Sequence, residues 1–116
     1  MIKLYYRKHS KASKDAIEWF KQQNLDINIQ NINSISEGDI FQSLYLSDID
    51  VPYILRRGLA FFFLYAEEKK AKELRFSESL AYLEKKPYLL RDPIIISSDS
   101  SLIGYNEAKL KKLLKV

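Results

Sequence analysis

Hydrophobic and polar residues follow a strand, helix, strand pattern over the first third of the chain. Residues 2–6 alternate as a strand does, and residues 11–24 then carry apolar side chains at near-helical spacing. Ser10 or Ser13 is placed to cap that helix, because a hydroxyl there accepts a hydrogen bond from a free backbone N–H. Residues 25–32 alternate again. This order predicts a right-handed βαβ unit with parallel strands.

The middle of the chain, residues 36–86, has little alternation and indicates several short helices in succession. Ser36 is the expected cap of the first helix, and Pro52 suits the first turn of the next. Ser77 is the expected cap of the last helix, which should end before Pro87. The pattern therefore predicts a helical insertion.

The last part of the chain returns to strands. Residues 94–96 are all isoleucine and follow Pro93, which is typical of a short buried strand. Residues 99–101 suit a hairpin turn into a second strand at 102–103, and Asn106 is the expected cap of a C-terminal helix. The order βαβ, helical insertion, ββα predicts an α/β protein with a thioredoxin-like core that is interrupted in the middle.

Length and composition fit one globular domain. The 116 residues suit a single domain at 1–116, with the thioredoxin-like core at 1–33 and 87–116 and the helical insertion at 34–86. No apolar run is long enough to cross a bilayer, and the start of the chain turns polar too early for a signal peptide. We therefore expect a cytoplasmic protein without membrane contact. The net charge of +4 is too diffuse to indicate direct nucleic-acid binding by the chain alone.

The chain has no cysteine, which excludes disulfides, thiolate metal sites and thiol catalysis by its own residues. The single histidine, His9, stands beside Ser10, but no carboxylate near in the sequence would orient it, so support for a serine nucleophile is weak. A lone histidine with scattered acids also indicates no metal site. No metal and no cofactor are therefore expected.

Four stretches of the sequence resemble one known family. They are Ile2-Lys3-Leu4-Tyr5 before a loop and a helix, the block from Pro87 to Ile96, the block Ile103-Gly104-Tyr105-Asn106-Glu107, and Arg57 with Phe61 four residues later. Together they resemble the Spx and arsenate reductase (ArsC-like) family, and the Gly-Tyr-Asn-Glu block resembles its Spx branch. The resemblance extends from end to end of the chain and implies the thioredoxin-like fold.

The resemblance also implies a degenerate active site. It places Pro93 in the cis form beside the N-terminus of the first helix, where relatives hold an anion or a thiolate. Ser10 and Ser13 stand where relatives carry one or two cysteines, and Asp92 stands where they carry an arginine. A hydroxyl ionises far less readily than a thiol, and a carboxylate repels an oxyanion. We therefore expect no arsenate reduction and a protein that is not an enzyme.

Spx-like proteins bind the C-terminal domain of the RNA polymerase α subunit, and the resemblance implies the same partner. Ser47, Asp48 and Asp50 occupy the matching loop of the insertion, with Asp50 where relatives have a glycine. Arg57 matches the family's mid-chain arginine, either as a polar contact or as a side chain packed on Phe61. The first hypothesis is a redox-insensitive transcriptional regulator. The alternative is a non-catalytic binding module of the same fold with another protein partner.

Lysines are frequent in the predicted C-terminal helix, at Lys109, Lys111, Lys112 and Lys115. Such a set forms either a contact surface for an anionic partner or the solvated side of a helix whose leucine side is buried. Both interpretations are consistent with the spacing.

Overall fold

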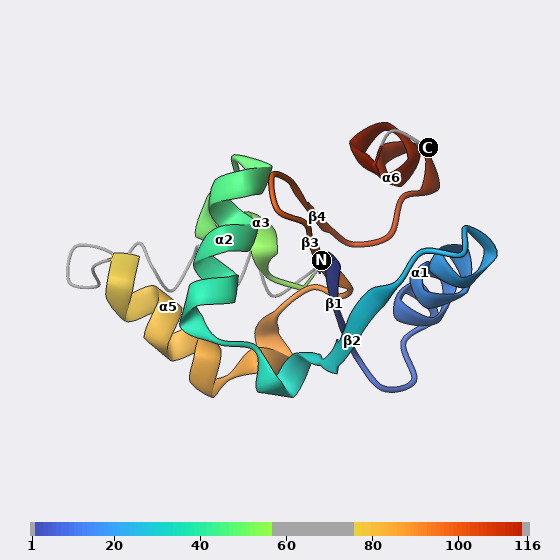
Figure 1. Ribbon diagram of the computed structural model, residues 1–116. Helices are drawn as coiled ribbons and strands as arrows, with labels where there is room; N and C mark the ends of the chain where they lie inside the picture. Colours follow the sequence, from blue (N-terminus) through green and yellow to red (C-terminus); the bar gives the residue numbers. More distant parts are fainter. Residues whose placement is uncertain (1, 57–75, 115–116) are drawn as a thin grey trace.

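One mixed sheet of four strands organises the protein (Figure 1). The computed structural model describes residues 2–56 and 76–114. The strands are β1 (Ile2–Tyr6), β2 (Ile27–Asn31), β3 (Ile94–Ile96) and β4 (Ser101–Ile103), in the order β2-β1-β3-β4. β1 pairs with β2 in parallel, and β3 runs antiparallel to both β1 and β4. The two central strands therefore come from opposite ends of the chain.

Helices lie on both faces of this sheet (Figure 1). They are α1 (Lys11–Gln22), α2 (Glu37–Ser47), α3 (Val51–Ile54), α5 (Phe76–Lys85) and α6 (Glu107–Leu114), with 3-10 turns at Ile32–Ser34 and Pro87–Leu89. α1 and α6 pack on one face, whereas α2, α3 and α5, which lie between β2 and β3 in the sequence, pack on the other. This arrangement confirms the predicted fold class, a thioredoxin-like α/β core interrupted by helices.

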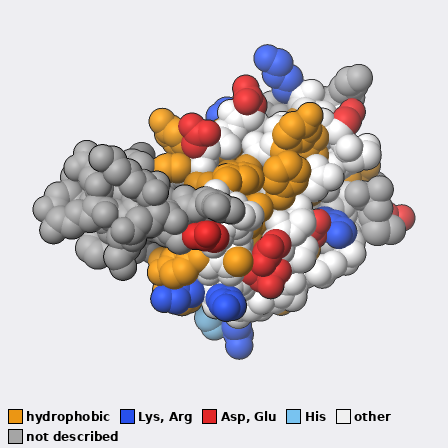
Figure 2. All heavy atoms as spheres, turned by 90° about the vertical axis from the view of Figure 1, so that its left-hand side faces the viewer, with side chains coloured by type: hydrophobic (Ala, Val, Ile, Leu, Met, Phe, Trp, Pro, Cys, Tyr) orange, Lys and Arg blue, Asp and Glu red, His pale blue; other side chains and the backbone are white. Residues whose placement is uncertain are grey.

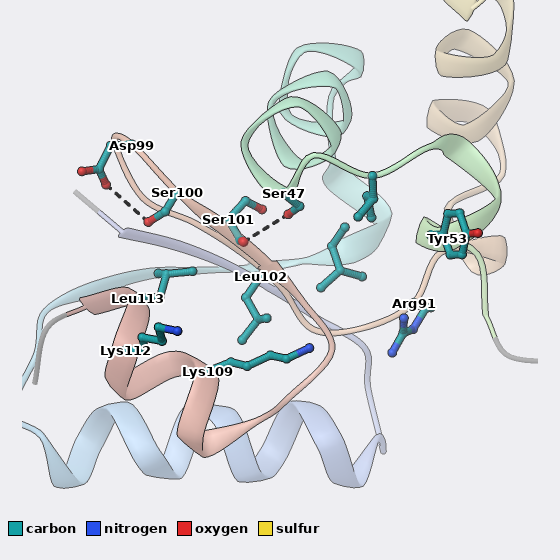
Figure 3. Close-up of a pocket in the computed structure, with 12 residues that line it drawn as sticks. Ser47, Tyr53, Arg91, Asp99, Ser100, Ser101, Leu102, Lys109, Lys112 and Leu113 are labelled. Carbon is teal, nitrogen blue, oxygen red and sulfur yellow. Dashed lines mark hydrogen bonds between the residues drawn. The ribbon is translucent and has the colours of Figure 1, made fainter.

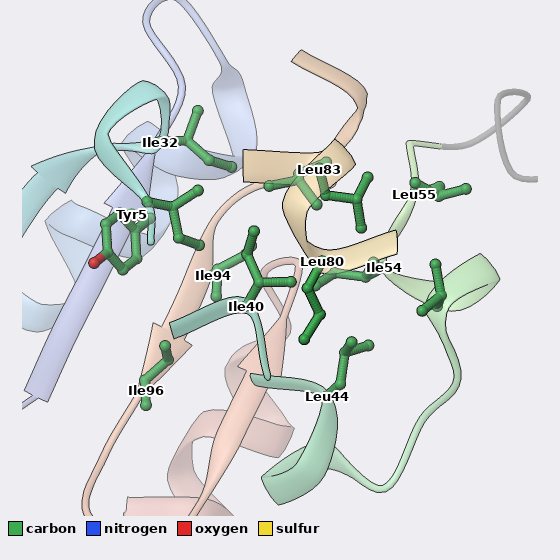
Figure 4. Close-up of a cluster of buried hydrophobic side chains, with 13 residues drawn as sticks. Tyr5, Ile32, Ile40, Leu44, Ile54, Leu55, Leu80, Leu83, Ile94 and Ile96 are labelled. Atoms are coloured by element: carbon green, nitrogen blue, oxygen red, sulfur yellow. The ribbon is translucent and has the colours of Figure 1, made fainter. Parts of the chain in front are cut away.

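Successive residues of each strand contribute to opposite faces of the sheet, because side chains alternate along a strand. On β1, Leu4 packs with Leu110 of α6 in the cluster beneath α1 and α6. Its neighbour Tyr5 packs with Ile40 of α2 and Leu83 of α5 in the cluster on the other face (Figure 4). Burying one such aliphatic side chain contributes about 1.5–3 kcal/mol. The two clusters hold the sheet between the helical layers, and so fix the loop after β1 and the segment before β3.

Polar caps begin the helices largely where the sequence predicted. The Ser36 hydroxyl caps α2 by accepting a backbone hydrogen bond at 3.1 Å, and Asn106 Oδ1 caps α6 in the same way at 3.0 Å. The prediction for Ser77 was wrong, because Ser77 lies inside α5 (Phe76–Lys85) and does not precede it. A serine near a helix start is an N-cap only where its own backbone is extended, which sequence alone does not give.

Two predicted residues of the insertion, Arg57 and Phe61, lie outside the described residues. Across 2–56 and 76–114, no helix has the length and apolar character that a bilayer crossing requires. The division into a core at 1–33 and 87–116 and an insertion at 34–86 stays a prediction.

Candidate functional site

The loop after β1 leads into the N-terminus of α1, where the predicted degenerate site lies. Ser10 is the N-cap of α1: its backbone is extended (φ −82°, ψ 128°), and its Oγ accepts the Ser13 N–H at 3.3 Å. Ser13 is buried, and its Oγ accepts the Arg7 N–H at 3.0 Å. His9 is exposed, with φ 66°, and makes no hydrogen bond within the described residues. The helix start therefore presents two hydroxyls but no Ser–His pair.

Asp92 lies directly in front of this helix start. Its Oδ2 accepts the Ser13 hydroxyl at 2.7 Å, and its Oδ1 accepts Arg7 Nε–H at 3.0 Å. The ion pair is mostly buried, since the side chains of Arg7 and Asp92 are 19% and 11% exposed. The Asp92–Pro93 peptide bond is cis, as the resemblance implied. The structure thus brings all four predicted residues of the degenerate site to one place.

Arg7 is the residue of this site that the sequence analysis missed. In addition to the bond from Nε–H to Asp92, the Nη2 of Arg7 donates to the carbonyl oxygens of Leu90 and, at 3.4 Å, of Pro87. One guanidinium therefore holds the whole segment that precedes β3. The available signal was a basic side chain at the end of the first strand, opposite in charge to Asp92 and close in sequence to the predicted cap. With Arg7 present, Asp92 is an ion-paired carboxylate and not a bare repulsive charge.

Burial and hydrogen bonding act in opposite directions on the pKa of Asp92. Burial raises this pKa. The hydroxyls of Ser10 and Ser13 and the guanidinium of Arg7 together lower it by more, so that the pKa lies below its ordinary value of 3.8. The carboxylate is consequently ionised at neutral pH. It occupies a helix N-terminus, where free backbone N–H groups favour negative charge.

Arg91, which precedes Asp92, contributes to a different part of the molecule. Its guanidinium lies against Gly104, where an added Cβ would come within 3.0 Å of Nη2. Gly104 has φ 86°, a conformation that favours glycine. Adjacent side chains of an extended segment point to opposite sides, so Arg91 lies away from the Asp92 carboxylate.

Three of the four predicted partner-binding residues lie at the junction of α2 and α3, on the other face of the sheet from α1 (Figure 1): Ser47, Asp48 and Asp50. The Ser47 hydroxyl donates to the Ser101 carbonyl at 3.1 Å. Asp48 ends α2 in the left-handed conformation (φ 54°), whereas Asp50 is extended (φ −88°) at the start of α3. Asp48, and not Asp50, therefore has the backbone conformation that favours glycine.

The sheet order and the placement of the α1 N-terminus against the segment before β3 define a thioredoxin-like α/β protein. A sequence profile described as the ArsC family matches residues 5–113. The chain therefore belongs to the ArsC family. A search of curated proteins gives no match.

Solved structures share this fold over nearly their whole length at low sequence identity. An ArsC family related protein from Bacteroides fragilis has a TM-score of 0.77 and 15% identity, with 97% of this chain and 96% of that chain covered. The protein SACOL0876 from Staphylococcus aureus has a TM-score of 0.77 and 18% identity, with 97% of both chains covered. An arsenate reductase from Vibrio cholerae has a TM-score of 0.67 and 16% identity, with 99% and 96% covered. These likenesses establish the fold and assign no residue roles.

The comparisons contradict the expectation that the chain is not an enzyme. Its family is ArsC, and a structure named as an arsenate reductase shares its fold. The expectation was drawn from two positions, Ser10 in place of a cysteine and Asp92 in place of an arginine. Those positions bear only on reduction by a thiol of the chain itself, which is a narrower statement than the absence of catalysis.

Proposed function

We propose that this ArsC-family protein belongs to the Spx-like branch and is a redox-insensitive transcriptional regulator that binds the C-terminal domain of the RNA polymerase α subunit. The observation that carries the proposal is an exposed aromatic cluster, formed by Phe41, Tyr45 and Phe76, on the helices of the insertion. It lies beside the loop Ser47–Asp50, which matches the polymerase-binding loop of Spx-like proteins in chain order. Exposed aromatic side chains are enriched where proteins bind one another.

The aromatic cluster is an ordered surface feature. The rings of Phe41 and Tyr45 stack with centroids 5.9 Å apart, and Phe76 meets Phe41 edge-on at 6.1 Å. With Asp48 and Asp50 these rings border a hollow of about 250 Å³. Hydrophobic side chains gather on this side of the molecule with acidic side chains around them (Figure 2). An apolar centre with a charged rim is the usual composition of a protein contact site.

Redox insensitivity follows from the composition of the chain. With no cysteine, the protein has no thiol that an oxidant can convert to a disulfide or a sulfenic acid. Ser10 and Ser13 stand where relatives carry cysteines, and the Asp92 carboxylate at the same helix start pairs with Arg7 whatever the redox conditions. Binding through the insertion is therefore expected to be the same under reducing and oxidising conditions.

Isothermal titration calorimetry with the isolated α C-terminal domain tests the proposal. Tyr45→Ala should weaken binding by about tenfold or more, as truncation of an interface aromatic commonly does. Tyr88→Ala is the matched control, because Tyr88 is also an exposed tyrosine but lies outside the aromatic cluster. Hydrogen peroxide should leave the affinity unchanged. Absence of binding, or equal effects of the two substitutions, would reject the α domain as the partner of this surface.

The alternative, a binding module with a different protein partner, is favoured by the charge of the same loop. Asp48 and Asp50 are both exposed and carry two carboxylates where Spx-like proteins approach the polymerase closely through a glycine. A partner with basic residues around an apolar centre would suit such a loop. This alternative predicts that the α domain does not bind, while immobilised protein retains a basic partner that Tyr45→Ala releases.

A further inference from the structure

Strand β4 is at the edge of the sheet, and its outer backbone groups are largely unpaired. On either side of β4, the Ser100 carbonyl accepts the Ser97 N–H and the Gly104 N–H donates to the Pro93 carbonyl, each at 2.8 Å. Because hydrogen-bonded positions alternate along an antiparallel pair, the N–H and C=O groups of Ser101 and Ile103 point away from β3. Of these groups, the Ser101 carbonyl accepts the Ser47 hydroxyl, and the others have no partner within the described residues. The edge is therefore open to a further strand at Ile103, whereas Ser101 is buried and its carbonyl is already bonded to Ser47.

An open groove of about 560 Å³ borders this edge (Figure 3). The end of α2 and the start of α3 form one side of the groove, and α6 forms the other. Ile49, Leu102 and Leu113 give it apolar walls, and the exposed ring of Tyr53 lies at one end. The buried Ser101 hydroxyl lies at the side of the groove and has no hydrogen-bond partner among residues 2–56 and 76–114. The groove thus joins an unpaired backbone edge to apolar side chains.

The charges around the groove are mainly positive. Arg91, Lys109 and Lys112 line it, and each lacks an acidic partner among the described residues. Lys111 of the same helix differs, because it pairs with a glutamate at 3.3 Å and does not line the groove. The carboxylate in the lining, Asp99, accepts the hydroxyls of neighbouring serines at 3.3 Å. Three cations against one carboxylate favour an acidic occupant.

We propose that β4 binds an extended acidic segment of a partner protein, which adds to the sheet as its fifth strand. The incoming backbone bonds the outer N–H and C=O groups of Ile103 and runs along the edge past the Ser47–Ser101 bond. Side chains of that strand alternate, so acidic ones face Lys109 and Lys112 on α6, while apolar ones pack on the side of Ile49. A second copy of this chain is disfavoured because its β4 edge carries the same lysines, and like charges repel across such a pair. This surface is separate from the aromatic cluster, and the inference does not depend on the proposed function.

Fluorescence anisotropy with a labelled peptide of alternating glutamate and valine tests the charge requirement. The double substitution Lys109→Glu with Lys112→Glu should weaken binding by about tenfold or more at low salt, because it reverses the charge that faces the peptide. Lys111→Glu is the control for one such charge reversal: it lies on the same helix outside the groove, and it should reduce affinity far less than either Lys109→Glu or Lys112→Glu alone. Circular dichroism confirms that each variant is folded. Equal effects of Lys111→Glu and of these single substitutions would overturn the proposal.

A second probe separates strand addition from attraction between charges. The same peptide, methylated at alternate backbone nitrogens, keeps its charge but loses the donors that pair with β4. It should bind about tenfold more weakly or worse, and the unmodified peptide should protect the Ile103 amide from hydrogen exchange. Equal affinity of the two peptides would overturn strand addition. Stronger binding of a single-stranded oligothymidylate than of the acidic peptide would instead assign the groove to nucleic acid and overturn the inference.

Discussion

The Arg7–Asp92 ion pair allows a direct test of what holds the start of α1 against the segment before β3. Asp92→Asn keeps the shape of the side chain and removes its charge. The carboxylate accepts two hydrogen bonds, from Arg7 Nε–H at 3.0 Å and from the Ser13 hydroxyl at 2.7 Å. The amide oxygen can still accept one of them without a charge, and the amide NH2 faces the other donor, so that bond is lost. The perturbation therefore acts on the contacts that define the site.

The magnitude follows from the burial of the pair. Breaking a fully buried ion pair costs about 3–5 kcal/mol, and breaking an exposed one costs about 0–1 kcal/mol. The side chains of Arg7 and Asp92 are 19% and 11% exposed, between these limits but nearer the buried one. Arg7 also keeps its bonds to the Leu90 and Pro87 carbonyls in the variant, which limits the loss. We expect Asp92→Asn to lower the free energy of unfolding by about 2 kcal/mol at neutral pH.

Urea unfolding followed by circular dichroism measures this loss, and its pH dependence identifies the cause. The pKa of Asp92 is lower in the folded protein than its ordinary value, so its contribution is complete above about pH 4 and is lost as the pH falls through the folded pKa. The stability difference between the wild type and Asp92→Asn should therefore shrink below about pH 4. A cycle with Arg7→Met should give a coupling energy of about 1–2 kcal/mol. A difference that persists unchanged in acid, or a coupling near zero, would refute the ion pair as the stabilising contact.

Three further substitutions test other parts of the site and fold. Asp48→Gly should raise the free energy of unfolding by about 0.5–1 kcal/mol, because Asp48 ends α2 in the left-handed conformation (φ 54°), which glycine adopts without strain. Urea unfolding measures this gain, and a lower free energy of unfolding would contradict the left-handed conformation. Gly104→Ala should lower the free energy of unfolding by about 1–2 kcal/mol, because Gly104 has φ 86° and an added Cβ would come within 3.0 Å of Arg91 Nη2. An unchanged melting temperature would contradict this packing. In the variant Ser10→Cys, the pKa of the new thiol should be about one unit higher than in the double variant Ser10→Cys with Asp92→Asn. The reason is that the Asp92 carboxylate opposes a second negative charge. Alkylation rates against pH measure that difference, and coincident curves would place Asp92 away from the helix start.

Features encoded by neighbouring residues were predicted well. The caps at Ser36 and Asn106 need only a polar side chain one residue before an apolar period, and the run at 94–96 is a buried strand because it is wholly β-branched. The failure at Ser77 is of the same local kind, since helix boundaries shift by one or two residues with packing. Local chemistry therefore predicted the elements, and their order along the chain together with the resemblance predicted the thioredoxin-like core.

Features that join distant parts of the chain were not predictable in this way. Arg7 and Asp92 are separated by 85 positions, and no periodicity links them. The open edge at β4 follows from the sheet order, which places this strand last, and not from the composition of residues 101–103. The mistaken expectation about enzymatic activity has a related cause, because it inferred a property of the whole site from single positions without the partners that surround them.

The pairing of charges explains where an anion can bind this protein most favourably. At the start of α1 the positive end of the helix and Arg7 are already matched by Asp92, so a second anion meets a site that is electrically satisfied. The β4 groove keeps Arg91, Lys109 and Lys112 without acidic partners in the described part of the chain. The charge that looks diffuse in the sequence is thus partly gathered at one edge of the sheet. Because Asp92→Asn does not alter the groove, it should lower stability and leave the affinity for the acidic peptide unchanged.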